Sequence, residues 1–182
     1  EVPQAKMELG RRLYNDTALS GDNTISCATC HSLDHGGAEP RRVSNGIRGQ
    51  SGPINSPTVL NSSLHIRQFW DGRAADLAEQ AAGPVANPLE MGAVWDDVVA
   101  RLGADPSYVE AFRAAGYEGV SQTNITDAIA AFESTGPVSR PEIWDRYPQP
   151  GDESPGETPI ESPEPVVAAA AEQVSHNVQT VA

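Results

Sequence analysis

The feature that most constrains this chain is the run Cys27-Ala28-Thr29-Cys30-His31. It places two thiols three residues apart and an imidazole directly after the second thiol. Attachment of a haem through two thioethers requires this spacing, and the adjacent histidine then reaches the iron from the same side. Because the chain contains only two cysteines and four histidines, chance spacing is improbable, on the order of one in four thousand. The motif therefore predicts one covalently attached haem c, bound by Cys27, Cys30 and His31.

Three other interpretations of the same motif remain open. Cys27 and Cys30 could form a disulfide in an oxidising compartment. A redox-active C-x-x-C pair would also place a thiol at the start of a helix. A zinc site would need two further ligands nearby, for which the chain offers only His35 and His65. Of these interpretations, the haem is the one that requires the histidine directly after the second cysteine.

The charge balance restricts the partners. The chain carries a net charge of -13, and such an acidic protein should avoid nucleic acid and anionic membrane surfaces. No apolar run approaches the ~18 residues of a membrane span. Residues 31–73 nevertheless contain five arginines. They could neutralise haem propionates, face an acidic redox partner, or simply form a solvated loop.

The motif also bears on location. Haem attachment to C-x-x-C-H normally takes place outside the cytoplasm. We therefore expect a periplasmic or extracellular protein whose leader has been removed, so that Glu1 begins the mature chain.

The spacing of apolar residues predicts an all-α fold with long loops. Residues 16–62 are dominated by glycine, serine, asparagine and proline, which is typical of loops. A loop of this length normally counts against a compact domain, but a haem would supply the apolar surface that the loop lacks. The helices are expected at residues 4–15, 74–82, 95–102, 106–115 and 124–133.

The composition divides the chain into three parts. Residues 1–147 are expected to form a cytochrome c-like domain with one haem. Residues 148–165, rich in proline, glutamate, serine and glycine, predict an extended acidic linker. Residues 166–182 would align their valines on one face if helical. This tail is either frayed or docks onto another subunit or a second copy, and both interpretations remain open.

Four segments carry a resemblance to a known family. They are ISCATCHSLDHGG (25–37), NSPTVLNSS (55–63), QFWDGRAADLAEQAAGPVANPLEMG (68–92) and NITDAIAAFEST (124–135). On these segments the chain resembles the N-terminal, peroxidatic-haem domain of bacterial di-haem cytochrome c peroxidases, a group that includes the related enzyme of methylamine utilisation.

The resemblance implies roles for particular residues. His31 corresponds to the proximal ligand of the peroxidatic haem. Gln80 and Glu90 fall where the family keeps the distal pair that handles peroxide and its protons. Trp70 matches the tryptophan placed between the two haems, on the electron route. Asn55 matches a residue beside the interdomain calcium site.

The chain also departs from the family pattern. Ile47 stands where a distal histidine often ligates the resting haem, and the second haem domain has no counterpart in this sequence. The sixth position of the iron would then be open, hold water, or take a substitute. Met91 and His65 are candidate substitutes, as is His176 from a neighbouring copy, although core packing is the simpler role for Met91.

Two functions are weighed on this basis. One is electron transfer by a mono-haem cytochrome, as a carrier or a subunit of a larger assembly that meets a redox partner protein. The alternative to this first function is reduction of hydrogen peroxide at an open distal site, with Gln80 and Glu90 as catalytic residues. A haem-binding sensor or scaffold is a third.

Overall fold

The computed structural model describes residues 2–136, and this part of the chain is helical. The α-helices are α1 (Gln4–Asn15), α2 (Cys27–Cys30), α3 (Leu77–Ala86), α4 (Trp95–Gly103), α5 (Pro106–Ala114) and α6 (Gln122–Thr135), with short 3-10 turns at η1 (Thr17–Leu19), η2 (Leu33–His35), η3 (Ile47–Gly49) and η4 (Ser62–Leu64). Within residues 2–136, β pairing is limited to two isolated bridges. The all-α prediction is confirmed, whereas the linker and tail predicted at 148–182 lie outside the described residues.

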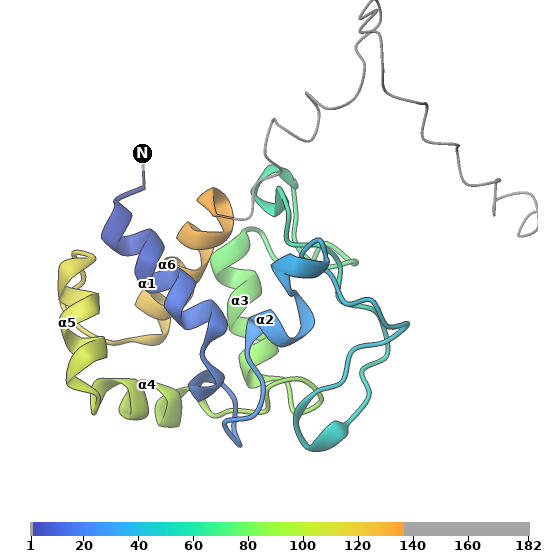
Figure 1. The fold of residues 1–182 in the computed structure, drawn as a ribbon, viewed down its shortest axis with the longest axis horizontal. Helices are drawn as coiled ribbons and strands as arrows, with labels where there is room; N and C mark the ends of the chain where they lie inside the picture. Colours follow the sequence, from blue (N-terminus) through green and yellow to red (C-terminus); the bar gives the residue numbers. More distant parts are fainter. Residues whose placement is uncertain (1, 137–182) are drawn as a thin grey trace, which may run out of the picture. The chain divides into compact units, whose positions relative to one another are not determined.

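Helices α1 and α6 cross closely at the centre of the described part (Figure 1). The crossing depends on Gly10, because a Cβ atom there would lie 1.9 Å from the carbonyl oxygen of Ala128. One turn further along α1, the ring of Tyr14 packs on that of Phe132, with centroids 5.2 Å apart. The absence of a side chain at residue 10 thus lets two backbones meet, and the aromatic pair fixes their register.

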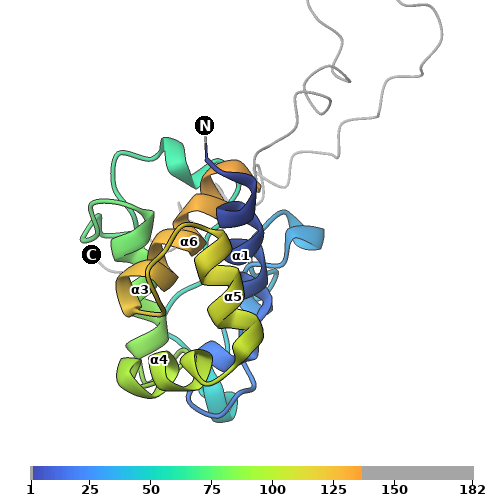
Figure 2. The ribbon, with the colours of Figure 1, turned by 90° about the vertical axis from the view of Figure 1, so that its left-hand side faces the viewer.

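A hydrophobic core lies among α1, α3, α4, α5 and α6, which Figure 2 shows from the side of α5. The amphipathic spacing seen in the sequence explains this arrangement, since each helix turns its apolar stripe inward. The most deeply buried large members are Leu13, Leu19, Leu102, Phe112, Ile125 and Ile129.

Helix α3 differs from its sequence prediction at both ends. It begins at Leu77 rather than residue 74, because the carboxylate of Asp76 accepts a hydrogen bond from the Glu79 amide and caps the helix. It also continues to Ala86, so the prediction that Gly83-Pro84 ends the helix is wrong. Pro84 removes one helical donor, yet the Asn87 amide still bonds to the Gly83 carbonyl at 3.0 Å and closes the last turn.

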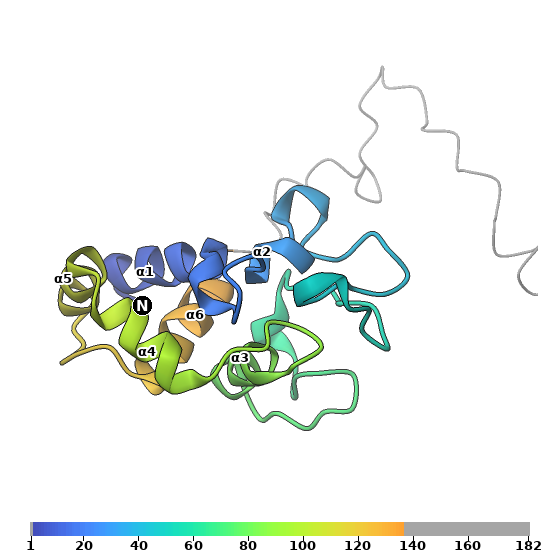
Figure 3. The same ribbon diagram turned by 90° about the horizontal axis from the view of Figure 1, so that it is seen from below.

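Residues 16–76 form the loop region, and the part that follows α2 lies on the side of α2 away from α5 (Figure 3). Its chain is organised by 3-10 turns and hydrogen bonds rather than by long helices. Few of its large apolar side chains are buried, and Leu64, Ile66 and Trp70 are largely exposed. None of the helices between residues 2 and 136 is long and apolar enough to cross a membrane.

Candidate haem-binding site

The motif cysteines lie at the two ends of the single-turn helix α2. Ser26 caps this turn: its backbone amide donates a hydrogen bond to the Thr29 hydroxyl oxygen at 3.0 Å, and the Ser26 side chain pairs with Thr29 in return. This reciprocal cap satisfies donors that the first turn of a helix otherwise leaves free. The sequence Ser-Cys-x-Thr-Cys therefore builds its own local scaffold for the two thiols.

The segment that leads into α2 is held by Arg101 of α4. Its guanidinium donates hydrogen bonds to the carbonyl oxygens of Ala18 and Ser20 and to the side-chain oxygen of Asn23. The hydroxyl of Ser20 in turn accepts the amides of Thr24 and Ile25. The turn before the motif is thus fixed to the helical core by polar contacts.

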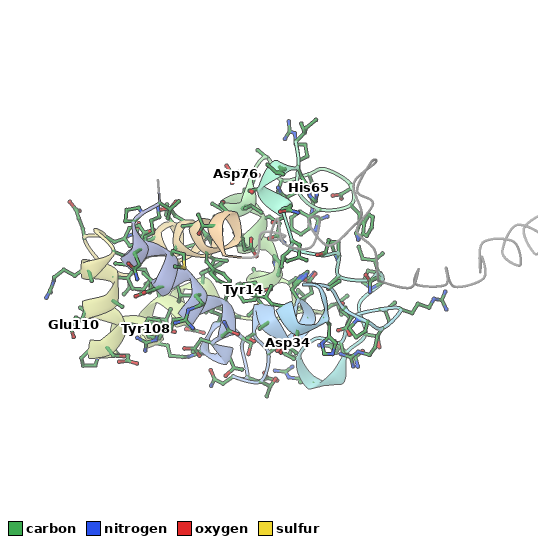
Figure 4. The ribbon with its side chains drawn as sticks, turned by 45° about the horizontal axis from the view of Figure 1, so that its top comes forward. Tyr14, Asp34, His65, Asp76, Tyr108 and Glu110 are labelled. Atoms are coloured by element: carbon green, nitrogen blue, oxygen red, sulfur yellow. The ribbon has the colours of Figure 1, made fainter. Side chains whose placement is uncertain are left out.

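Tyr14 connects the helical core to the motif itself. Its hydroxyl donates to the carbonyl oxygen of His31, and its ring is buried beside Val59 and Phe132. Figure 4 shows Tyr14 near the end of α1, next to the loop region. Burial raises the pKa of Tyr14, and the charges of Cys27 and Glu133 raise it further. The group therefore stays a neutral hydrogen-bond donor.

The imidazole of His31 is oriented so that its Nε2 atom is available to bind a metal. Its Nδ1 atom lies 2.8 Å from the carbonyl oxygen of Pro57. A carbonyl oxygen only accepts hydrogen bonds, so Nδ1 must carry the proton and Nε2 keeps its lone pair. Burial lowers the pKa of His31, which favours the neutral ring that a metal requires.

The two thiols do not match the alternative interpretations of the motif. Cys27 and Cys30 are both free, so no disulfide joins them. Burial, followed by the charge of Glu133, raises the pKa of Cys27 to about 12, and burial also raises the pKa of Cys30. A redox-active pair needs a lowered thiol pKa instead.

A zinc site also finds no support in the described part. Residues 2–136 contain no group of three or more histidine, cysteine, aspartate or glutamate side chains that could hold a metal ion. His35 and His65, the two candidates, are exposed. The residues present do fit a covalently attached haem: two free, protonated thiols flank one helical turn, and the next residue is a neutral histidine with Nε2 available.

The loop that contains Ile47 closes onto the turn before Met91. The Ile47 amide donates to the Glu90 carbonyl at 2.8 Å, and the Ile47 side chain is buried. A Cβ atom at Gly92 would come 2.3 Å from Ile47 Cδ1. Isoleucine at this position therefore packs as a core residue against the turn.

Glu90 is a half-buried carboxyl group on this turn. The amide of Asn87 donates to its Oε1 atom at 2.7 Å. Burial raises the pKa of Glu90, while Asn87 and the positive charge of Arg73 act in the opposite direction. The charge of Glu90 also reaches Cys30, whose pKa it raises. The structure thus brings Glu90 close to the motif.

Gln80, the other predicted distal residue, lies half-buried on α3. Its backbone belongs to the first turns of that helix, and its amide bonds to the Asp76 carbonyl. Within residues 2–136, no hydrogen bond joins its side chain to Glu90. Its distal role stays a prediction.

Trp70 belongs to a second polar network at the motif. Its indole N–H donates to the Asn55 carbonyl at 3.1 Å, and the side-chain amide of Asn55 donates to the carbonyls of Glu39 and Arg41. The buried carboxylate of Glu39 forms a two-pronged ion pair with Arg41, at 2.9 and 3.0 Å. The Arg41 side chain lowers the pKa of Glu39.

The candidate sixth ligands lie in different surroundings. Met91 is buried within the hydrophobic core cluster. Its carbonyl accepts the Gly21 amide. His65 is exposed, and Figure 4 shows it near the start of α3, where Asp76 is labelled. His176 lies outside the described residues. Ligation by any of these three remains a prediction.

Sequence analysis missed Tyr14 and Glu133 as residues of the site. In the sequence Tyr14 is simply one position of the helix expected at residues 4–15, and nothing there indicates that its hydroxyl reaches His31. Glu133 did leave a signal, because it follows Ile125, Ile129 and Phe132 on one helical face, where a charged side chain is unusual.

A helical domain that presents a C-x-x-C-H turn, with a neutral histidine fixed by a backbone carbonyl, defines a c-type cytochrome domain. The family model of the di-haem cytochrome c peroxidases matches residues 4–154. The chain belongs to this family, as the resemblance implied, and the family binds c-type haem.

Individual relatives agree with this assignment. The chain is 52% identical to cytochrome c peroxidase Ccp of Escherichia coli over 131 residues, which cover 71% of this chain and 28% of that protein. It is 49% identical to cytochrome c551 peroxidase of Nitrosomonas europaea, covering 70% of this chain and 39% of that protein. A solved MauG-like protein associated with microbial copper homeostasis superposes with a TM-score of 0.70 at 36% identity, covering 76% and 42% of the two chains. The chain thus spans well under half the length of these relatives.

Proposed function

We propose that residues 1–147 form a mono-haem domain that takes electrons from a redox partner protein and delivers them to hydrogen peroxide. The observation that carries the proposal is Glu90, a half-buried carboxyl group of raised pKa beside the haem-attachment turn. A bound haem would supply an iron centre for electron exchange and peroxide binding. The names of the two sequence relatives, both cytochrome c peroxidases, agree with this chemistry.

Peroxide reduction consumes two electrons and two protons and yields two water molecules. A residue that carries a proton between the peroxide oxygens must be able to bind and release it near neutral pH. Burial brings the pKa of Glu90 toward that range, and the hydrogen bond from Asn87 fixes the orientation of its carboxyl group. Gln80 would orient the peroxide by donating through its side-chain amide.

Electrons would enter at the exposed face of Trp70. The residue is 68% exposed, while its N–H donates to the Asn55 carbonyl, and the Asn55 side chain in turn donates to the Glu39 carbonyl. A side chain that is both accessible and fixed suits a contact point for a partner protein. The proposal places the protein in the periplasm or outside the cell and attaches one haem c to this sequence.

The test uses the full chain with its haem attached, a reduced small c-type cytochrome as electron source, and hydrogen peroxide. We expect Glu90→Gln to lower the rate of peroxide-dependent oxidation by about 100-fold or more, because general acid–base catalysis contributes at least that factor. Glu118→Gln, which removes an exposed carboxylate, is the matched control and should retain the rate.

A second function, electron transfer without peroxide turnover, is favoured by the single C-x-x-C-H motif. This sequence contains two cysteines, so its own residues would attach one haem, and a single haem passes one electron at a time to a partner. Wild-type protein that is reduced and reoxidised by carrier proteins, yet does not react with peroxide, would establish this function. Equal rates for wild type and Glu90→Gln would remove Glu90 from the mechanism.

A further inference from the structure

Glu133 lies in the last turn of α6 with only 5% of its surface exposed. It shares a helical face with Ile125 and Ile129, where an apolar side chain would be expected. Burial of a carboxyl group is costly unless the group is hydrogen-bonded or paired with a positive charge. A glutamate at this position therefore needs a physical reason.

The carboxyl group of Glu133 is also unpartnered. Within residues 2–136, no side chain donates a hydrogen bond to it and none forms an ion pair with it. Burial alone raises its pKa to about 7. Glu133 can therefore change its charge near neutral pH, which exposed carboxylates do not do.

Glu133 lies beside the point of haem attachment. Its charge raises the pKa of the Cys27 thiol and of the Tyr14 hydroxyl, so the carboxyl group is close to both. Cys27 also packs against the cluster formed by Tyr14, Val59 and Phe132, and Phe132 directly precedes Glu133. A haem joined to Cys27 would thus have this buried acid as a near neighbour.

We propose that Glu133 is a redox-linked proton-binding residue: it takes up one proton from solvent when the attached haem accepts one electron, and releases that proton when the electron leaves. The electron comes from a one-electron reductant, in the cell the partner protein. Reduction removes one positive charge from the haem iron, and a neighbouring carboxylate then binds a proton more tightly. The inference rests on haem attachment but is independent of peroxide reduction.

The other groups that face Glu133 do not supply this titration. From α1, Tyr14 has its pKa raised away from neutrality by burial. From α2, Cys27 loses its thiol proton when it forms a thioether. Helix α3 and turn η4 also pack against α6, and no described ionisable group on them shifts the pKa of Glu133.

Two acids act on the other cysteine and could add a pH dependence of their own. Glu39 and Glu90 both raise the pKa of Cys30. Glu39 is held ionised by its pair with Arg41, so it titrates at acidic pH. Glu90 has a raised pKa, and a variant of Glu133 must therefore be compared with one of Glu90.

The experiment measures the midpoint potential of the full, haem-containing chain by spectroscopic redox titration with a chemical reductant, at a series of pH values around 7. We expect the wild-type potential to fall as pH rises, by 59 mV for each tenfold difference in proton affinity between the two redox states. Glu133→Gln should abolish this fall, and Glu133→Asp should retain it over a shifted pH range. Glu110→Gln, on α5 far from the motif (Figure 4), should behave as wild type.

A wild-type potential that does not change with pH would overturn the proposal, as would a fall that persists in Glu133→Gln and disappears in Glu90→Gln. If Glu133→Gln does not fold, redox-difference infrared spectra of the wild type decide instead. The carbonyl band of a protonated carboxylic acid should appear on reduction, and its absence counts against Glu133. No peroxide enters these measurements, so inactivity toward peroxide contradicts only the proposed function.

Discussion

The helical core and the loop region of the described part are stabilised in different ways. The core packs Leu13, Phe112 and Ile129 with almost no surface exposed, and close contact of apolar side chains holds it together. The loop region is ordered mainly by hydrogen bonds, and it leaves Leu64 and Ile66 80% and 94% exposed. The comparison shows that the helical core is stabilised by its own apolar side chains. The loop region has few buried apolar side chains, so we expect it to depend on apolar contacts with a bound haem.

The largest expected effect comes from removing the attachment thiols. The double variant Cys27→Ala, Cys30→Ala should lose all covalently bound haem, which the mass of the denatured protein measures directly. Because the loop region has few buried apolar contacts of its own, amide exchange should then become much faster in residues 22–73 while α1 and α6 stay protected. Equal protection of the loops with and without haem would show that hydrogen bonds alone hold them.

The next effect concerns the crossing of α1 and α6. Gly10→Ala would place a methyl group 1.9 Å from the Ala128 carbonyl oxygen, so the helices must move apart. We expect a loss of about 3 kcal/mol in the free energy of unfolding, measured in denaturant. Gly103→Ala at the end of α4 is the control, since its methyl group would meet no atom within 4 Å. A similar loss in both variants would contradict the close crossing.

Substitution of Tyr14 tests the hydrogen bond that connects the helical core to the loop region. Tyr14→Phe keeps the ring on Phe132 but removes the hydrogen bond to the His31 carbonyl, at a cost of about 1–3 kcal/mol. The haem absorption bands should change as well, because the peptide of His31, the proposed axial ligand, loses its hydrogen bond.

The control for this change lies wholly within the core. Tyr108→Phe removes a hydroxyl that donates to Asp16, so it should also lower stability but leave the haem spectrum as in the wild type. A spectrum that changes equally in both variants would mean that Tyr14 acts only through overall stability.

The smallest effect is electrostatic and concerns a partly exposed ion pair between α1 and α6. Asp127 accepts hydrogen bonds from Lys6 and Tyr117, and these contacts, working against burial, lower its pKa. A lowered carboxyl pKa stabilises the folded state above the unfolded value near 4 and loses this contribution as pH falls further. Asp127→Asn should therefore cost under about 1 kcal/mol at pH 7.

The free energy of unfolding of wild type and Asp127→Asn, measured by chemical denaturation at neutral pH and near pH 3, gives the contribution of the Lys6–Asp127 ion pair. The difference between wild type and Asp127→Asn should disappear in acid. The haem spectrum should be the same in both proteins at pH 7, since Lys6, Tyr117 and Asp127 form a partly exposed cluster on α1, α6 and the loop before α6. A difference that persists in acid would mean that packing, rather than charge, accounts for the effect.

The chain's own sequence predicted the helices and the proposed haem attachment, because both depend on local spacing. Apolar periodicity predicted α1 and α6, and five consecutive residues predicted the haem donors. The ends of α3 were predicted less well, because contacts with neighbouring residues set them. The Asp76 cap and the turn after Pro84 determine where the helix begins and ends, whereas local propensity alone indicated other positions.

Only the tertiary structure decided which polar groups meet. The Pro57 carbonyl that fixes the proton on His31 lies 26 residues away in sequence, and the Tyr14 hydroxyl comes from another helix. The burial of Glu133 beside Cys27 likewise depends on the crossing of α1 and α6, which Gly10 allows. A sequence specifies donors and acceptors one by one, but the pKa and partner of each depend on the packing of distant segments.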